Sequence, residues 1–229
     1  MEKLTFYIVD VFAEEKYAGN QLAVFRGVKA LSNAEMQKIA KEMNYSETTF
    51  ILSDEKRDDG YDVRIFTPKR ELPFAGHPTL GTAYIIQREI VKEPVNIIAL
   101  NLKVGQIPVT FSYIEEHVDI LWMKQMRPTF GQTFGAGLVS QVLSLDVREM
   151  ENRFPVQEVS TGVPFIIVPL KTLDGLRRAR IARDKYFEFI EDTQAKALLI
   201  FCPQTYKKEN DLNVRVFADY HGVPEDPAT

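Results

Sequence analysis

Alternation between apolar and polar residues predicts a chain built mainly from β-strands. Segments rich in Val, Ile, Phe, Tyr and Thr recur along the whole sequence, and β-branched and aromatic residues favour strands. The predicted strands cover residues 4–12, 22–26, 47–53, 61–66, 95–102, 106–113, 117–123, 163–169, 197–202 and 212–217.

Helical patterns are fewer. A helix is predicted after Ser32, which has the spacing of a capping box with Glu35. Apolar residues at positions 36, 39, 40 and 43 then fall on one helix face. A second helix is expected from an N-cap at Asp184 to about Thr193. Weaker helical patterns cover residues 136–151 and 174–180.

The segment from Gly76 to Ile86 differs from the other helical patterns. Its residues, GHPTLGTAYII, are small or apolar all round, and Pro78 suits a first helical turn because its missing N–H needs no partner there. A helix without a polar face should be buried on every side. We therefore expect a sheet that wraps around a central helix.

Two parts of the sequence resemble each other. VRIFT at 63–67 precedes a Pro-rich turn at 71–79, and VRVFA at 214–218 precedes another at 222–229. The Arg and the first Pro are nine positions apart in both, and 19–25 loosely matches 162–168. Chance similarity of two such strands is the alternative. Otherwise, the repeat predicts two duplicated halves, 1–114 and 115–229, with a cleft between them.

Composition and charge argue against several classes of partner: nucleic acid, metal ions and membranes. The chain has 229 residues, with 28 Lys and Arg against 32 Asp and Glu and no basic run, so nucleic acid is not an expected partner. The single cysteine, Cys202, lies in an apolar run and is predicted to be a buried strand thiol. The histidines lack metal-ligand spacing, so no metal is expected. With no signal peptide and no apolar stretch near the ~20 residues of a membrane span, we expect a soluble, cytoplasmic protein.

Candidate acid–base residues lie on the turns of the repeat and at a strand start. Glu47 opens an apolar run, so it is either a solvated strand end or a partly desolvated proton shuttle. His77 stands at a helix start, where free N–H groups favour anions, but it could simply be a capping or packing histidine. Asp226 in the second turn could instead be an N-cap. Asn20 follows Gly19 in what could be only a tight turn.

These motifs resemble the PhzF-like phenazine-biosynthesis family, within the diaminopimelate-epimerase-like fold. The string FAGHPT at residues 74–79 is the most specific part of the resemblance. The matching pieces are DVF at 10–12, GNQLAV at 19–24, SETTF at 46–50, RIFTP at 64–68, ELPFAGHPTLG at 71–81, STGVP at 160–164 and EDPAT at 225–229.

The resemblance implies an α+β protein of two pseudo-symmetric domains, each a mostly antiparallel sheet rolled around a central helix. It also implies a homodimer and a cofactor-independent isomerase that moves a proton on a small cyclic or amino- or hydroxy-carboxylic acid. The best-known family member isomerises trans-2,3-dihydro-3-hydroxyanthranilate. Two-thiol racemisation is not supported, because Cys202 lies outside both turns.

The resemblance also assigns site residues. Glu47 matches the acid–base carboxylate, His77 a substrate-contacting histidine, and Asp226 the aspartate of an Asp-Pro-Ala-Thr-Gly-Ser-Ala motif; these three are the expected catalytic residues. The expected substrate-binding residues are Asn20, Gly76, Pro78 and Thr79.

Two alternatives stay open. One is an epimerase or racemase of a small carboxylic acid, with two acid–base groups on opposite faces of the substrate. The other is a non-catalytic member that binds small acids. Because the family motif continues beyond Thr229, we expect the second domain to be incomplete here and the natural protein to be several dozen residues longer. Phenazine synthesis is only one of the possible roles.

Overall fold

The computed structural model describes residues 3–228 and divides into two compact units. The first unit runs to Met126 and includes Ala228, and the second covers Arg127–Pro227. Each unit combines a mixed β-sheet with a few helices, so the predicted α+β class is confirmed. The predicted boundary after residue 114 stays a prediction. Thr229 lies outside the described residues.

The first unit is an eight-stranded sheet. Its strands pair in the order β1-β2-β3-β4-β6-β7-β8, with β5 paired to β4. The pairs β2–β3 and β4–β6 are parallel, and the others are antiparallel. The strands are β1 (Thr5–Val11), β2 (Asn20–Arg26), β3 (Glu47–Ile51), β4 (Gly60–Phe66), β5 (Glu71–Leu72), β6 (Ile97–Leu102), β7 (Gly105–Ile114) and β8 (His117–Met123).

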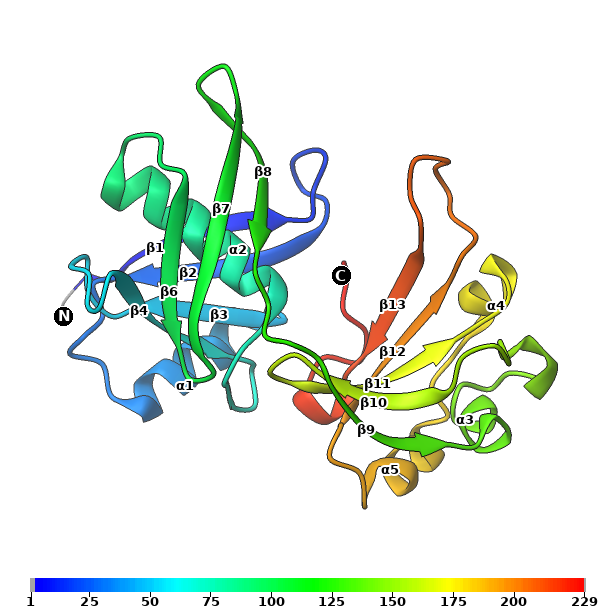
Figure 1. The fold of residues 1–229 in the computed structure, drawn as a ribbon. Helices are drawn as coiled ribbons and strands as arrows, with labels where there is room; N and C mark the ends of the chain where they lie inside the picture. Colours follow the sequence, from blue (N-terminus) through cyan, green and yellow to red (C-terminus); the bar gives the residue numbers. More distant parts are fainter. Residues whose placement is uncertain (1–2, 229) are drawn as a thin grey trace. The chain divides into compact units, whose positions relative to one another are not determined.

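Helix α2 (Gly76–Ile85) lies inside this sheet, as its sequence without a polar face predicts. It contacts strands β1, β2, β3, β6, β7 and β8, and Figure 1 shows it between the β1–β3 strands and the β6–β8 strands. Close approach depends on Gly81, because a Cβ there would meet the side chains of Leu22 and Val11 at 2.8 Å each. A π-helical segment (Ile86–Val91) continues α2.

Helix α1 (Asn33–Met43) packs on the same sheet and begins as predicted. The Glu35 N–H donates to the Ser32 hydroxyl at 3.3 Å, and the Ser32 N–H donates to the Glu35 carboxylate at 2.8 Å. Its buried residues Met36 and Ala40 belong to an apolar cluster with phenylalanines of β2, β3 and β4. The predicted capping box and apolar face are therefore confirmed.

The second unit holds a five-stranded sheet in the order β13-β12-β11-β10-β9. Its strands are β9 (Thr129–Phe134), β10 (Val156–Ser160), β11 (Pro164–Pro169), β12 (Ala197–Cys202) and β13 (Asn213–Phe217). Its α-helices are α3 (Ala136–Val142), α4 (Leu173–Arg178) and α5 (Arg183–Ile190), with 3₁₀ segments at Val147–Glu149 and Asp219–His221.

The predicted N-cap at Asp184 is wrong. Helix α5 begins at Arg183, and its N-cap is Ala182, which makes no side-chain capping bond. Asp184 lies in the first helical turn instead, where a carboxylate still interacts favourably with the positive end of the helix dipole.

The two sheets share a pairing pattern. In the first unit β1–β2 is antiparallel, β2–β3 parallel and β3–β4 antiparallel. In the second unit β10–β11, β11–β12 and β12–β13 follow the same antiparallel, parallel, antiparallel order. Helices lie between the second and third strands of each set. The repeated VRIF and VRVF sequences are therefore the last strands, β4 and β13, of two equivalent four-strand sets.

Candidate active site

Three polar side chains meet where strands β2 and β3 and helix α2 begin. Asn20 is the first residue of β2, Glu47 is the first residue of β3, and His77 is the second residue of α2. Because β2 and β3 run parallel, with Leu22 opposite Glu47, their first residues lie at the same edge of the sheet. The fold thus gathers three side chains from separate motifs.

The imidazole of His77 lies between the other two side chains. Its Nδ1 is 3.2 Å from Asn20 Nδ2, and its Nε2 is 3.4 Å from Glu47 Oε2. Asn20 is 1% exposed and His77 5% exposed, while the Glu47 side chain is 14% exposed. Glu47 is therefore the most exposed side chain of the three, although the Oε2 atom that faces His77 is itself buried.

The hydrogen bonds of Asn20 define the His77 tautomer. Asn20 Nδ2 also donates to the carbonyl oxygen of Ala228 at 3.1 Å. A carbonyl oxygen can only accept, which identifies this atom of Asn20 as the amide nitrogen. His77 Nδ1 must then accept, and the proton of the neutral ring sits on Nε2, facing Glu47.

Burial lowers the pKa of His77 to about 3. The ring is therefore neutral near pH 7, and its 3.4 Å contact with Glu47 is not an ion pair, although the distance would allow one. A neutral imidazole can direct its N–H toward a carboxylate without removing a proton from the carboxyl group. The neutral ring therefore faces the Glu47 carboxylate and does not compete with it for a proton near pH 7.

The start of α2 can receive an anion. The N–H groups of Gly76 and His77, at the first two helical positions, have no partner within the helix, and such groups attract anions. A Cβ at Gly76 would lie 3.3 Å from the Met123 methyl carbon, so a larger residue there would crowd this end of the helix.

The other predicted binding residues serve the helix itself. Pro78 is buried in the first turn of α2. The Thr79 hydroxyl donates to the carbonyl oxygen of Ala75 at 2.7 Å, and the Thr79 N–H points at the same oxygen at 3.3 Å. A substrate role for Pro78 and Thr79 stays a prediction.

Phe12 was not among the predicted site residues. Its ring centroid lies 6.5 Å from that of His77, edge on, and its backbone has a φ of 56°. The motif at residues 10–12 is the only sequence signal near it. Gly19 makes the tight turn before Asn20, with a φ of +67° and a Cβ position only 2.2 Å from the Val11 carbonyl oxygen.

Asp226 belongs to the second unit, just after β13. Its backbone N–H donates to the carbonyl oxygen of Val216 at 2.9 Å, and its side chain is half-buried. Cys202 is buried in β12, as predicted. Burial raises the pKa of its thiol, which donates to the Gln204 carbonyl at 3.2 Å. This cysteine is a packing residue of the strand.

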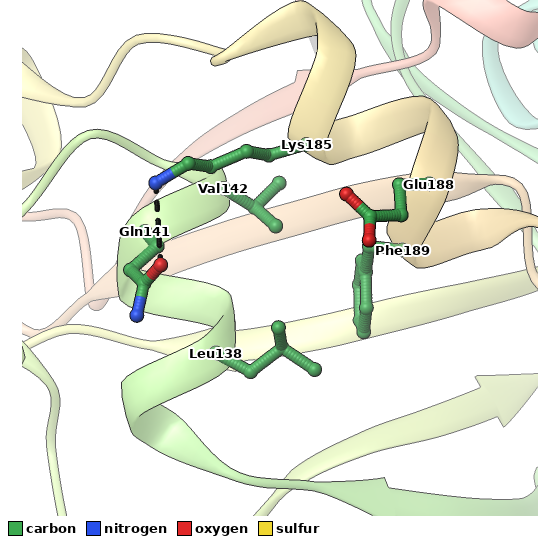
Figure 2. A pocket seen from close by; sticks show the side chains of 6 residues that line it. All are labelled: Leu138, Gln141, Val142, Lys185, Glu188 and Phe189. Carbon is green, nitrogen blue, oxygen red and sulfur yellow. Dashed lines mark hydrogen bonds between the residues drawn. The ribbon is translucent and has the colours of Figure 1, made fainter.

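A separate hollow of about 390 Å³ lies in the second unit between α3 and α5. Figure 2 shows the apolar side chains of Leu138, Val142 and Phe189 between the two helices, and Lys185, which donates to Gln141 at 3.2 Å. None of the predicted site residues lines it; the lining residues are Leu138, Gln141, Val142, Lys185, Glu188 and Phe189.

Two kinds of feature are absent from the part of the chain that the structure describes. Within residues 3–228, no group of three or more His, Cys, Asp or Glu side chains is placed to hold a metal ion. Over the same residues, every helix is too short or too polar to cross a membrane.

Comparison with solved structures identifies similar folds. A PhzF-family phenazine biosynthesis protein from Bacillus anthracis superimposes with a TM-score of 0.86 at 26% identity, covering 100% of this chain and 77% of that one. A probable proline racemase from Agrobacterium radiobacter gives a TM-score of 0.60 at 11% identity, covering 97% of this chain and 72% of that one. The second likeness concerns the fold alone.

Sequence comparison agrees. Trans-2,3-dihydro-3-hydroxyanthranilate isomerase from Pseudomonas aeruginosa is 31% identical over 224 residues, which cover 98% of this chain and 75% of the relative. An uncharacterised isomerase from Mesorhizobium japonicum is 30% identical over 241 residues, covering 100% and 78%. The family model described as phenazine biosynthesis-like protein matches residues 9–229. The chain therefore belongs to the phenazine biosynthesis-like (PhzC-PhzF) family.

Proposed function

We propose that this isomerase moves a proton between two carbon atoms of a small carboxylic acid, with Glu47 as the carrier and without a cofactor. The observation that carries the proposal is the Asn20–His77–Glu47 arrangement. It directs a neutral Nε2–H toward the carboxylate of a partly exposed glutamate beside the start of a helix. A single carboxyl group can take and return a proton if the substrate is held still.

The proton and the electrons of this step are all accounted for by the substrate and Glu47. The Glu47 carboxylate removes a proton from one carbon, and the electron pair of that C–H bond moves into the conjugated system of the substrate. Glu47 then returns the proton to another carbon of the same system. The substrate carboxylate rests on the N–H groups of Gly76 and His77 at the start of α2.

The isomerase from Pseudomonas aeruginosa suggests a first substrate. Its name specifies trans-2,3-dihydro-3-hydroxyanthranilate, a cyclic acid with conjugated carbons, and it is 31% identical to this chain over 98% of the chain's length. We therefore take unsaturated cyclic amino- and hydroxy-acids as the substrate class.

Asp226 is proposed as a further catalytic residue. Its backbone bond to Val216 fixes the turn after β13, and the equivalent strand of the first unit, β4, precedes the turn that ends in His77. Replacing Asp226 by Asn should lower turnover. An epimerase would need a second acid–base group of this kind, so full stereoinversion in Asp226→Asn would exclude Asp226 from that role.

The decisive experiment follows solvent deuterium entering trans-2,3-dihydro-3-hydroxyanthranilate, by NMR in D₂O. Glu47→Gln keeps the size of the side chain and removes its acid–base function, so exchange should fall at least ~100-fold, within the range of general acid–base catalysis. Glu42→Gln, an exposed glutamate of α1, is the matched control and should keep full exchange.

Other outcomes have definite meanings. Undiminished exchange in Glu47→Gln would overturn the role of Glu47. Binding of such acids without any exchange by the wild-type protein would favour the small-acid binder instead of an enzyme.

A further inference from the structure

A partly buried pair of charges links β4 to the start of the turn that leads into α2. Arg64 Nε and Nη2 donate to the two carboxylate oxygens of Glu71 at 2.8 and 2.7 Å, and the side chains are 20% and 15% exposed. Lys103 also donates to Glu71 at 2.6 Å. Arg64 lies on β4 and Glu71 on β5, directly upstream of the turn that leads into α2 and His77. The pair thus ties that turn to the sheet.

Glu71 keeps its charge in this position. Burial alone would raise the pKa of its carboxyl group, but the hydrogen bonds and charges of Arg64 and Lys103 outweigh burial and lower the pKa below its ordinary value. The bidentate contact is therefore present over the pH range in which an acid–base enzyme works.

The second unit repeats this contact. Arg215 Nε and Nη2 donate to the two carboxylate oxygens of Glu225 at 2.7 and 2.9 Å. Arg215 lies on β13, at the position in VRVF that Arg64 occupies in VRIF. Glu225 directly precedes Asp226. Both pairs therefore join the equivalent last strand to the turn that carries a proposed catalytic residue.

Each arginine is itself held in place. Arg64 stacks over Phe66 at 5.1 Å and Arg215 over Phe217 at 4.8 Å, measured to the ring centroids. The Nη1 of each also donates to a helix, from Arg64 to Asn33 Oδ1 of α1 at 2.6 Å and from Arg215 to the Leu176 carbonyl of α4 at 2.6 Å. A planar guanidinium fixed on three sides sets the direction of its partner, which a lysine cannot do.

We infer that Arg64–Glu71 and Arg215–Glu225 are paired positioning residues that hold the turns carrying His77 and Asp226. The inference rests on the proposed function only in the kinetic part of the test, which needs a substrate that turns over. Ion pairs at protein surfaces commonly contribute little to stability. The repetition of this geometry in two units, each time beside a turn of the proposed site, instead indicates a role in placing that turn.

The test compares Glu71→Gln and Glu225→Gln with Asp62→Asn in the otherwise unchanged chain. Asp62→Asn breaks another bidentate pair of the first unit, in which Arg57 donates to Asp62 at 2.8 and 2.7 Å, and is the matched control. In the deuterium-exchange assay, the two Glu variants should lose about tenfold in kcat with KM changed less than about twofold, because misplaced groups cost turnover. Asp62→Asn should change neither kcat nor KM.

A second readout does not depend on the substrate. In ¹⁵N-histidine NMR of the free protein, Glu71→Gln should shift the ring nitrogen signals of His77, and so should Arg64→Lys, because a lysine cannot make the bidentate contact. In Glu225→Gln, the Asp226 amide, which donates to Val216, should exchange with solvent faster than in the wild type. Asp62→Asn should leave both signals unchanged.

These measurements separate the positioning role of the ion pairs from the proposed function of Glu47. If the wild type shows no turnover but the His77 and Asp226 signals respond as expected, the positioning role stands and the proposed function fails. Unchanged signals in Glu71→Gln and Glu225→Gln would overturn the positioning role. So would equal losses of kcat in all three variants, since these would indicate a general effect on stability. Arg64→Lys supplies the same comparison if Glu71→Gln does not fold.

Discussion

Replacing His77 by Gln is expected to change how the stability of the first unit depends on pH. His77 is 5% exposed, and burial lowers its pKa from 6.5 to about 3. Between these two values the unfolded chain binds a proton at this residue and the folded chain does not. A fall in pH below about 6.5 therefore favours the unfolded state, and the loss levels off only near pH 3.

The size of this effect follows from the pKa difference. Each pH unit inside the window changes the free energy of unfolding by ~1.4 kcal/mol for one proton. The interval from pH 6.5 to pH 5 should then cost the wild type about 2 kcal/mol through His77 alone. Glutamine does not titrate, so His77→Gln should lose about 2 kcal/mol less than the wild type between pH 8 and pH 5.

Urea unfolding at pH 8, 7, 6 and 5 measures this difference. Trp122 is the sole tryptophan of the sequence and lies on β8, so its fluorescence follows the first unit. Other groups titrate in both proteins and cancel in the comparison. His117→Gln, which removes an exposed histidine of β8, is the control. Parallel curves for the wild type and His77→Gln would refute the assignment of a buried neutral ring.

Two further substitutions test the packing of α2. Gly81→Ala should destabilise the first unit by about 1–3 kcal/mol in urea unfolding, because its Cβ would lie 2.8 Å from Leu22 and Val11 side-chain atoms; unchanged stability would mean that α2 can shift freely. Thr82→Val should cost about 1–3 kcal/mol, because it strands the buried Thr49 hydroxyl now bonded to Thr82 at 2.8 Å. The double variant Thr49→Val/Thr82→Val should recover much of that loss, and no recovery would contradict the hydrogen-bond account.

Sequence patterns predict the fold well where a single physical demand dominates. The apolar run from Pro78 to Ile86 leaves no surface for solvent, and the structure encloses it within the sheet. The spacing of Ser32 and Glu35 suits one capping geometry, which the structure contains. The repeat of Arg64 and Arg215 predicts a duplication, which appears in the matching strand pairings of the two units.

Other elements are not visible in the sequence. Strand β9 (TFGQTF) contains a glycine and is mostly exposed, and β10 (VQEVS) carries Gln and Glu in its interior, so neither resembles a buried strand. Neighbouring strands override these weak local preferences. At Asp184 the capping residue type is present, but the helix begins at Arg183, two residues earlier than a cap at Asp184 would require.

In the candidate site, too, some features follow from local sequence and others only from the packing of distant segments. Glu47, His77 and Asn20 can each be selected from a local motif. Their contacts cannot, because Asn20 and His77 meet only through the parallel pairing of β2 with β3 and the packing of α2. The tautomer of His77 depends further on the Ala228 carbonyl, which is remote in sequence. The sequence therefore supplies the chemical groups, and long-range packing decides which proton faces which atom.

The enclosure of α2 has a consequence for the order in which the chain folds. The last strand of the first unit, β8, contacts α2, and the methyl carbon of Met123 at its end lies 3.3 Å from the Cβ position of Gly76. During synthesis, Asn20, Glu47 and His77 leave the ribosome well before β8 does. Contacts between residues far apart in sequence form slowly, because chain entropy must be lost first. The nascent chain thus carries all three groups for some time before the strand that covers the start of α2 is available.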